Sequence, residues 1–206
     1  MNVRERAKES YSLFYITLIS IISSLALSYY FATLEWSTLF GLRLVNFIYM
    51  CKLLATFLMI LLVWHEYVMS TLLFRWVIGY TDSIIPFLFG LVLFGAIRAI
   101  HMPTYVWLAA QLGFILIGWG AYWNQYSKVL LEPENENEFN VEFNRPLIRF
   151  CKIIAAVFFV ETCVSGRWSS CNLLQLFLVT IVCLVYIGFS MFTNFLRQPA
   201  FRLEKR

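Results

Sequence analysis

Four hydroxyl side chains recur at helical spacing near the start of the chain. They are Thr17, Ser20, Ser24 and Ser28, separated by three, four and four residues. Residues spaced in this way lie on one face of an α-helix, so the hydroxyls form a stripe on an otherwise apolar segment. In a membrane such a stripe faces another helix or a water-filled path. The spacing therefore predicts either a tight packing face or the lining of a pore.

A second polar group stands near the end of another apolar run, in the order Trp64-His65-Glu66-Tyr67. Trp and Tyr favour the membrane interface, and the imidazole between them titrates near neutral pH. His65 and Glu66 are therefore either part of an interfacial anchor or a gate that responds to protons or coordinates ions. Lys52, earlier in the same run, is expected to extend its long side chain toward the other interface.

Glu161 is an isolated acid within the apolar stretch KIIAAVFFVETCV. Ionisable groups at membrane depth are costly and usually have a purpose. We expect Glu161 either to form a structural ion pair or to attract ions at the mouth of a pore. Its candidate partners are Arg43, Arg98, His101 and Arg167.

Cys163 and Cys171 flank the short segment VSGRWSS. In an oxidising compartment they could form a disulfide that closes this turn, and otherwise they remain inert thiols. The sequence has no Cys/His cluster with zinc-ligand spacing and no GxSxG, HExxH, P-loop or GxGxxG motif. It therefore predicts no metal site, no cofactor and no enzymatic activity, with a lipid-modifying enzyme that uses His101 as the weakest alternative.

The composition shows what kind of molecule must position these groups. Of the 206 residues, 61% are hydrophobic and only 14% are charged, whereas about a quarter are charged in a soluble domain. This excludes a soluble enzyme or a nucleic-acid-binding domain. Because about 20 apolar residues span a bilayer as a helix, the sequence predicts an all-α integral membrane protein with one bundle of six spans. The predicted spans are residues 10–34, 44–68, 83–100, 102–127, 147–164 and 172–196.

The placement of Lys and Arg predicts the orientation of these spans. With six spans, both termini lie on one side of the membrane, together with twelve of the sixteen basic residues, against three on the other side and Lys52 within a span. Basic residues are enriched in the segments that stay in the cytoplasm. We therefore expect both termini to be cytoplasmic, and we expect the membrane to be the bacterial inner membrane.

Residues 132–144 have a different character and read EPENENEFNVEFN. Five glutamates and no basic residue indicate a solvated cytoplasmic loop between the fourth and fifth spans. Such a loop is either a spacer or a docking segment for a cytoplasmic protein.

The length, the six predicted helices and the polar first helix resemble the compact bacterial branch of the lysosomal-type potassium channels. In that family an Arg precedes a Phe-Ser-Asp motif in the first helix, and a Trp and a His stand near the end of the second. Here Arg6 precedes Glu9-Ser10-Tyr11-Ser12, and Trp64-His65 matches the second feature. The Phe-Ser-Asp motif itself is missing. The resemblance implies an oligomeric pore lined by the first helix.

Taken together, these patterns predict a subunit of a homo-oligomeric membrane channel, with the first helix along the ion path. The alternative is a non-conducting sensor or scaffold that recruits a cytoplasmic partner through residues 132–144, as in a bacterial envelope-stress or phage-defence system. The lipid bilayer is the expected surrounding in both cases, and no nucleic acid is expected as a partner.

Overall fold

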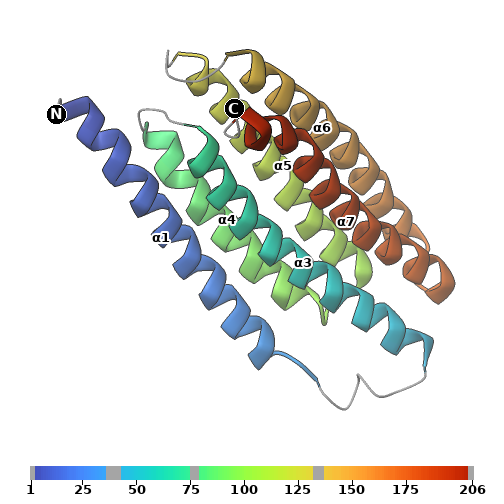
Figure 1. Ribbon diagram of the computed structural model, residues 1–206. Coiled ribbons are helices and arrows are strands. Elements are labelled where there is room, and N and C mark those ends of the chain that lie inside the picture. The colour runs from blue at the N-terminus through green and yellow to red at the C-terminus, as the bar shows by residue number, and fades with distance from the viewer. Residues whose placement is uncertain (1–2, 36–42, 75–78, 132–136, 204–206) are drawn as a thin grey trace.

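Six long helices run side by side in the computed structural model, which describes residues 3–35, 43–74, 79–131 and 137–203 (Figure 1). Within these ranges there is no strand, and the all-α prediction is confirmed. The helices are α1 (Val3–Ala32), α3 (Leu44–Leu73), α4 (Tyr80–Ala99), α5 (Thr104–Val129), α6 (Asn137–Arg167) and α7 (Asn172–Leu203).

Many large apolar side chains are exposed on the surface of the bundle. Large apolar side chains such as Leu13, Leu91 and Phe177 are 63–71% exposed on the outside of the helices. Soluble monomers rarely expose apolar patches of this extent. Five helices are also long and apolar enough to cross a membrane, namely α1, α3, α4, α5 and α7. These features indicate an integral membrane protein with several spans.

Helix α6 differs from the other five in composition. It has 31 residues, but Arg149, Lys152 and Glu161 interrupt its apolar part, and it is not among the five helices that meet the membrane-span criterion. The prediction of six helices is confirmed, but only five of the described helices are long and apolar enough to cross a membrane.

The prediction of a loop over residues 132–144 is wrong for its second half. Helix α6 begins at Asn137, so residues 137–144 form its first two turns, while residues 132–136 lie outside the described residues. The physical reason is an apolar stripe that begins inside the acidic segment. Phe143 is spaced by four residues from Leu147, as Leu147 is from Cys151, and all three are buried. This is the spacing of one helix face.

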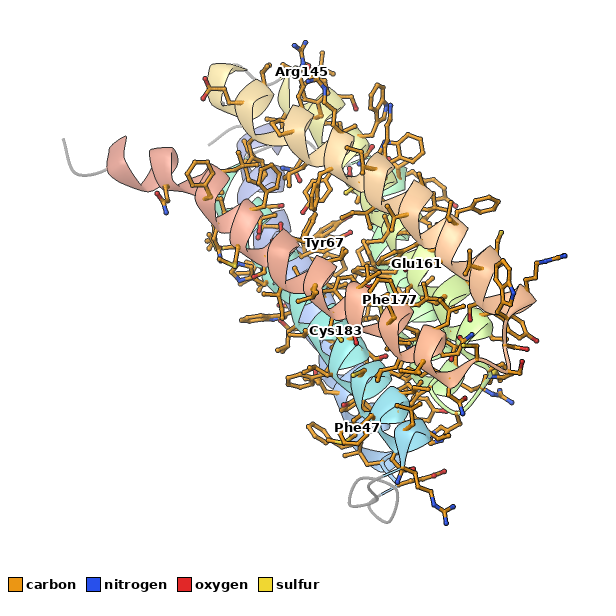
Figure 2. All side chains as sticks on the ribbon, turned by 90° about the vertical axis from the view of Figure 1, so that its right-hand side faces the viewer. Phe47, Tyr67, Arg145, Glu161, Phe177 and Cys183 are labelled. Carbon is orange, nitrogen blue, oxygen red and sulfur yellow. The ribbon has the colours of Figure 1, made fainter. Side chains whose placement is uncertain are left out.

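The order of packing places α1 and α6 on opposite flanks of the bundle. Helix α1 packs against α3 and α4, whereas α6 packs against α5 and α7, and Figure 1 shows the two helices at the two sides. Helix α1 begins and α7 ends at one end of the bundle, which we call the terminal end. Arg145 lies toward the terminal end and Phe47 toward the opposite end in Figure 2.

Lys52 reaches toward the opposite end but stays buried. Its Nζ donates a hydrogen bond of 2.8 Å to the carbonyl oxygen of Met102, in the short turn between α4 and α5. Only 5% of the residue is exposed. The expected extension into the interface is therefore replaced by a bond that satisfies a carbonyl of the turn, where the last carbonyls of a helix have no partner within it.

Candidate functional site at the terminal end of the bundle

Two charged side chains from α3 and α7 form a buried ion pair. Arg197 Nη2 lies 2.5 Å from Glu66 Oε2, which also accepts a 2.6 Å hydrogen bond from the hydroxyl of Tyr122. The other guanidinium nitrogen, Nη1, is 3.1 Å from His65 Nε2. We call Glu66, Arg197, Tyr122 and His65 the Glu66 network. It joins three helices, because Tyr122 comes from α5.

The Glu66 network lies in an apolar setting and is not fully satisfied. Arg197 is 1% exposed, and its guanidinium carbon lies 5.5 Å from the centre of the Phe143 ring. Glu66 Oε1 and Arg197 Nε have no hydrogen-bond partner among the described residues. Burying two charges is costly unless their remaining bonds are also made. The Glu66 network is therefore a candidate functional site.

A second buried ion pair ties the start of α4 to the end of α5. Asp82 is 3% exposed and forms a salt bridge with Lys128. Its Oδ1 accepts a 2.5 Å hydrogen bond from the side-chain amide of Asn124, and its Oδ2 accepts a 2.7 Å bond from the backbone N–H of Gly79. Asn124 and Lys128 lie one helical turn apart, so both face α4. We call these groups the Asp82 network.

The sequence explains why Asp82 stands at this position. It is the third residue of α4, and its carboxylate accepts the N–H of Gly79, which precedes the helix. Backbone N–H groups at a helix start lack partners within the helix, and a negative charge there is favourable. The Asp82 carboxylate is therefore held by the start of its own helix as well as by Lys128.

A cavity lies between the two networks, in the centre of the bundle. Its empty space measures about 900 Å³ when the open mouth is included. All six helices contribute to its wall, from Tyr15 of α1 to Phe189 of α7. Both acids, Glu66 and Asp82, line it. A concave, mainly apolar space with a few convergent polar groups is the usual form of a binding site.

The predicted hydroxyl stripe faces away from this cavity. Thr17, Ser24 and Ser28 are exposed on α1. Ser20 is partly buried, because its hydroxyl oxygen accepts a 3.1 Å hydrogen bond from Trp64 Nε1 of α3. The stripe thus lies on the flank of the bundle, with one of its four members directed toward α3.

Glu161 is buried without any of its expected partners. It is 4% exposed, and both of its carboxylate oxygens have no hydrogen-bond partner among the described residues. Figure 2 shows it on the side of α6 that faces the other helices. The structural ion pair with Arg43, Arg98, His101 or Arg167 is therefore not formed. His101 instead pairs with Glu35, at 3.2 Å from Nδ1 to Oε1.

The two cysteines at the turn between α6 and α7 are free and exposed. Cys163 lies in the last turns of α6, and Cys171 precedes α7. Among the residues that the structure describes, no three His, Cys, Asp or Glu side chains gather where they could hold a metal ion.

The sequence analysis singled out Glu66 and His65 but not their partners Arg197 and Tyr122. It also did not single out Asp82 and Lys128. The order of the helices along the chain could have revealed these partners. The end of the second span, the start of the third and the ends of the fourth and sixth all lie at one end of a six-helix bundle, so these charges had to meet.

No family model matches the chain, and neither a curated protein nor a solved structure is significantly similar to it.

Proposed function

We propose that the chain is a subunit of an oligomeric membrane channel, in which α1 of each subunit faces a shared ion path. The observation that supports this proposal most directly is the exposed stripe of Thr17, Ser24 and Ser28 on a flank helix. A hydroxyl stripe on the outer face of a membrane helix favours contact with water or with another helix over contact with lipid.

The hydrogen bonds of the stripe favour cations over anions. Thr17 Oγ1 donates to the carbonyl oxygen of Leu13 at 2.8 Å, and Ser24 Oγ donates to that of Ser20. Each hydroxyl has one hydrogen to donate, so its oxygen is left as an acceptor directed outward. Oxygen acceptors that replace part of the hydration shell are what cation pathways use.

The proposed assembly is a homo-oligomer in the bacterial inner membrane, with both termini in the cytoplasm. The resemblance to the compact six-helix potassium channels supports the same arrangement. The sensor or scaffold alternative relied on residues 132–144 as a docking loop. It is less favoured, because residues 137–144 belong to α6 and Phe143 is buried against the bundle.

The test compares two matched threonine substitutions in proteoliposomes. Thr17→Leu places an apolar group on the proposed path, where a narrow apolar ring blocks ions by dewetting. Thr180→Leu is the control, because Thr180 is also exposed and also donates to the carbonyl of the preceding turn, at 2.8 Å, but lies on α7. We expect cation flux to fall about tenfold or more in Thr17→Leu, a barrier increase of about 1.4 kcal/mol, and to be unchanged in Thr180→Leu.

Oligomer assembly is measured in the same preparations by crosslinking. If the stripe lines a path, flux should fall in Thr17→Leu while the oligomer stays intact. If the stripe is a packing face, Leu would overfill the interface, and the oligomer would dissociate before flux changes. A wild-type protein that assembles but conducts no ion at any tested pH or voltage would contradict the channel proposal.

A further inference from the structure

The central cavity is polar at one end and apolar at the other. Toward the terminal end its wall contains Glu66, Ser70, Asp82 and Gln125, from the last turns of α3 and α5 and the first turn of α4. Deeper in the bundle the wall is formed by aliphatic and aromatic side chains. These include Val63, Phe89, Phe114, Ile154, Tyr186 and Phe189. A molecule that fills this space must therefore be amphiphilic, with its head at the terminal end.

The polar end offers one unused acceptor and one unused donor. Glu66 Oε1 and Gln125 Nε2 are buried and have no hydrogen-bond partner among the described residues. Glu66 is 9% and Gln125 7% exposed, and both line the cavity. A buried polar atom without a partner costs about 1–3 kcal/mol. A head group that both donates and accepts, such as a hydroxyl or an amide, would satisfy both residues.

The charges around the cavity are already balanced. Glu66 is paired with Arg197, and Asp82 is paired with Lys128. An added cation or anion would be an unpaired charge in a buried site, which is strongly unfavourable. The head group is therefore uncharged.

We propose that this cavity is a binding site for a small uncharged amphiphile with a hydroxyl or amide head. The head lies between Glu66 and Gln125, and the apolar body lies among the rings of Phe89, Phe114 and Tyr186. The proposal is independent of ion conduction, because the cavity lies inside the subunit and the exposed hydroxyl stripe of α1 does not line it.

Two glycines of α5 provide a matched pair of variants. A Cβ added at Gly118 or at Gly120 would meet no atom within 4 Å, so both sites accept a side chain. Gly118 lines the cavity, whereas Gly120 is exposed and does not. Gly118→Leu therefore fills the cavity, and Gly120→Leu adds the same side chain to the same helix outside it.

The probe is monodecanoylglycerol, added to the full-length protein in lipid nanodiscs, and binding is read as an increase in unfolding temperature. A ligand that binds the folded state alone raises this temperature in a saturable manner. We expect the increase in wild type and in Gly120→Leu but not in Gly118→Leu. Gln125→Leu should bind about fivefold more weakly, because it removes one hydrogen bond. Decanoate and decylammonium, which differ in head charge, should bind at least about tenfold more weakly.

Several outcomes would overturn the proposal. One is a wild-type protein whose unfolding temperature the glycerol ester does not change. Another is an equal, saturable increase in Gly118→Leu, which would place the probe elsewhere. Equal binding of the charged probes would refute an uncharged head group. If Gly118→Leu does not fold, Gln125→Leu and the comparison of head groups still decide the question.

Discussion

Arg197 and Glu66 are 131 residues apart in the chain, and their charged groups meet at 2.5 Å. The contact joins the last turns of α7 to the last turns of α3, at the terminal end of the bundle. Because the Tyr122 hydroxyl bonds the same carboxylate oxygen, at 2.6 Å, α5 is held to the pair as well. Three helices are therefore fixed at one point.

Breaking this ion pair from one side should destabilise the protein strongly. Arg197→Met leaves the Glu66 carboxylate buried without its counter-charge, and the expected cost is about 3–5 kcal/mol of unfolding free energy. Replacing both residues, as in Glu66→Leu with Arg197→Met, removes both buried charges and should restore part of the loss. Reversible unfolding in micelles of wild type, Glu66→Leu, Arg197→Met and the double variant measures the coupling between the two residues. If the loss of unfolding free energy in the double variant equals the sum of the losses in the two single variants, the two residues do not interact.

The hydrogen bond between Trp107 and Thr56 should matter for stability in the other half of the bundle. Trp107 Nε1 donates to Thr56 Oγ1 at 3.1 Å, and both residues are completely buried. Thr56→Val keeps the shape but leaves the indole N–H without an acceptor, at an expected cost of about 1–3 kcal/mol. Thr56→Ser keeps the acceptor and serves as the control for the hydroxyl. An equal loss in both variants would assign the effect to the missing methyl group instead.

The first turns of α6 should be protected although their sequence is acidic. Phe143 is 1% exposed and its ring is tilted against that of Phe74, with 5.7 Å between ring centres. Phe143→Ala should cost about 3–5 kcal/mol, as is usual for a buried aromatic residue. Glu142→Ala, at the exposed neighbouring position, should change stability by less than about 0.5 kcal/mol. Hydrogen exchange over residues 141–147 is the second measurement, and rapid exchange there in wild type would restore the loop interpretation.

The orientation of the bundle can be tested with two single cysteines in a variant without the native ones. Ser127 lies near the end of α5, at the terminal end, and Ser169 lies in the turn between α6 and α7, at the opposite end. Both are exposed. With cytoplasmic termini, a membrane-impermeant reagent outside intact cells should label Ser169→Cys and not Ser127→Cys. The reverse pattern would place the termini outside.

The sequence was sufficient for the helices and insufficient for their charged contacts. Long apolar runs predicted all six helices, because a chain in lipid must satisfy its backbone hydrogen bonds within each segment. The hydroxyl spacing also identified one face of α1, and the exposure of Thr17, Ser24 and Ser28 confirms that this face is not buried inside the subunit. Whether it lines a path stays a prediction.

The ends of the helices were harder to predict, since hydropathy locates only the apolar part of each helix. Helix α6 begins ten residues before its predicted span, because its apolar stripe continues among glutamates and asparagines. The partners of Glu66 and Asp82 depend on how helices pack side by side, which spacing along one chain does not determine. Glu161 shows the same limit, because neither of its carboxylate oxygens has a partner in the part of the chain that the structure describes.

The distance along the chain between Glu66 and Arg197 has a consequence for biosynthesis. The ribosome adds about 5–20 residues per second, so the 131 residues that separate the two groups require about 7–26 s of translation. Through that interval α3 has emerged with an acid whose partner has not yet been made. A chain that ends before residue 197 lacks the counter-charge of Glu66, so the position of this ion pair makes the correct packing of α3 depend on completion of the last helix.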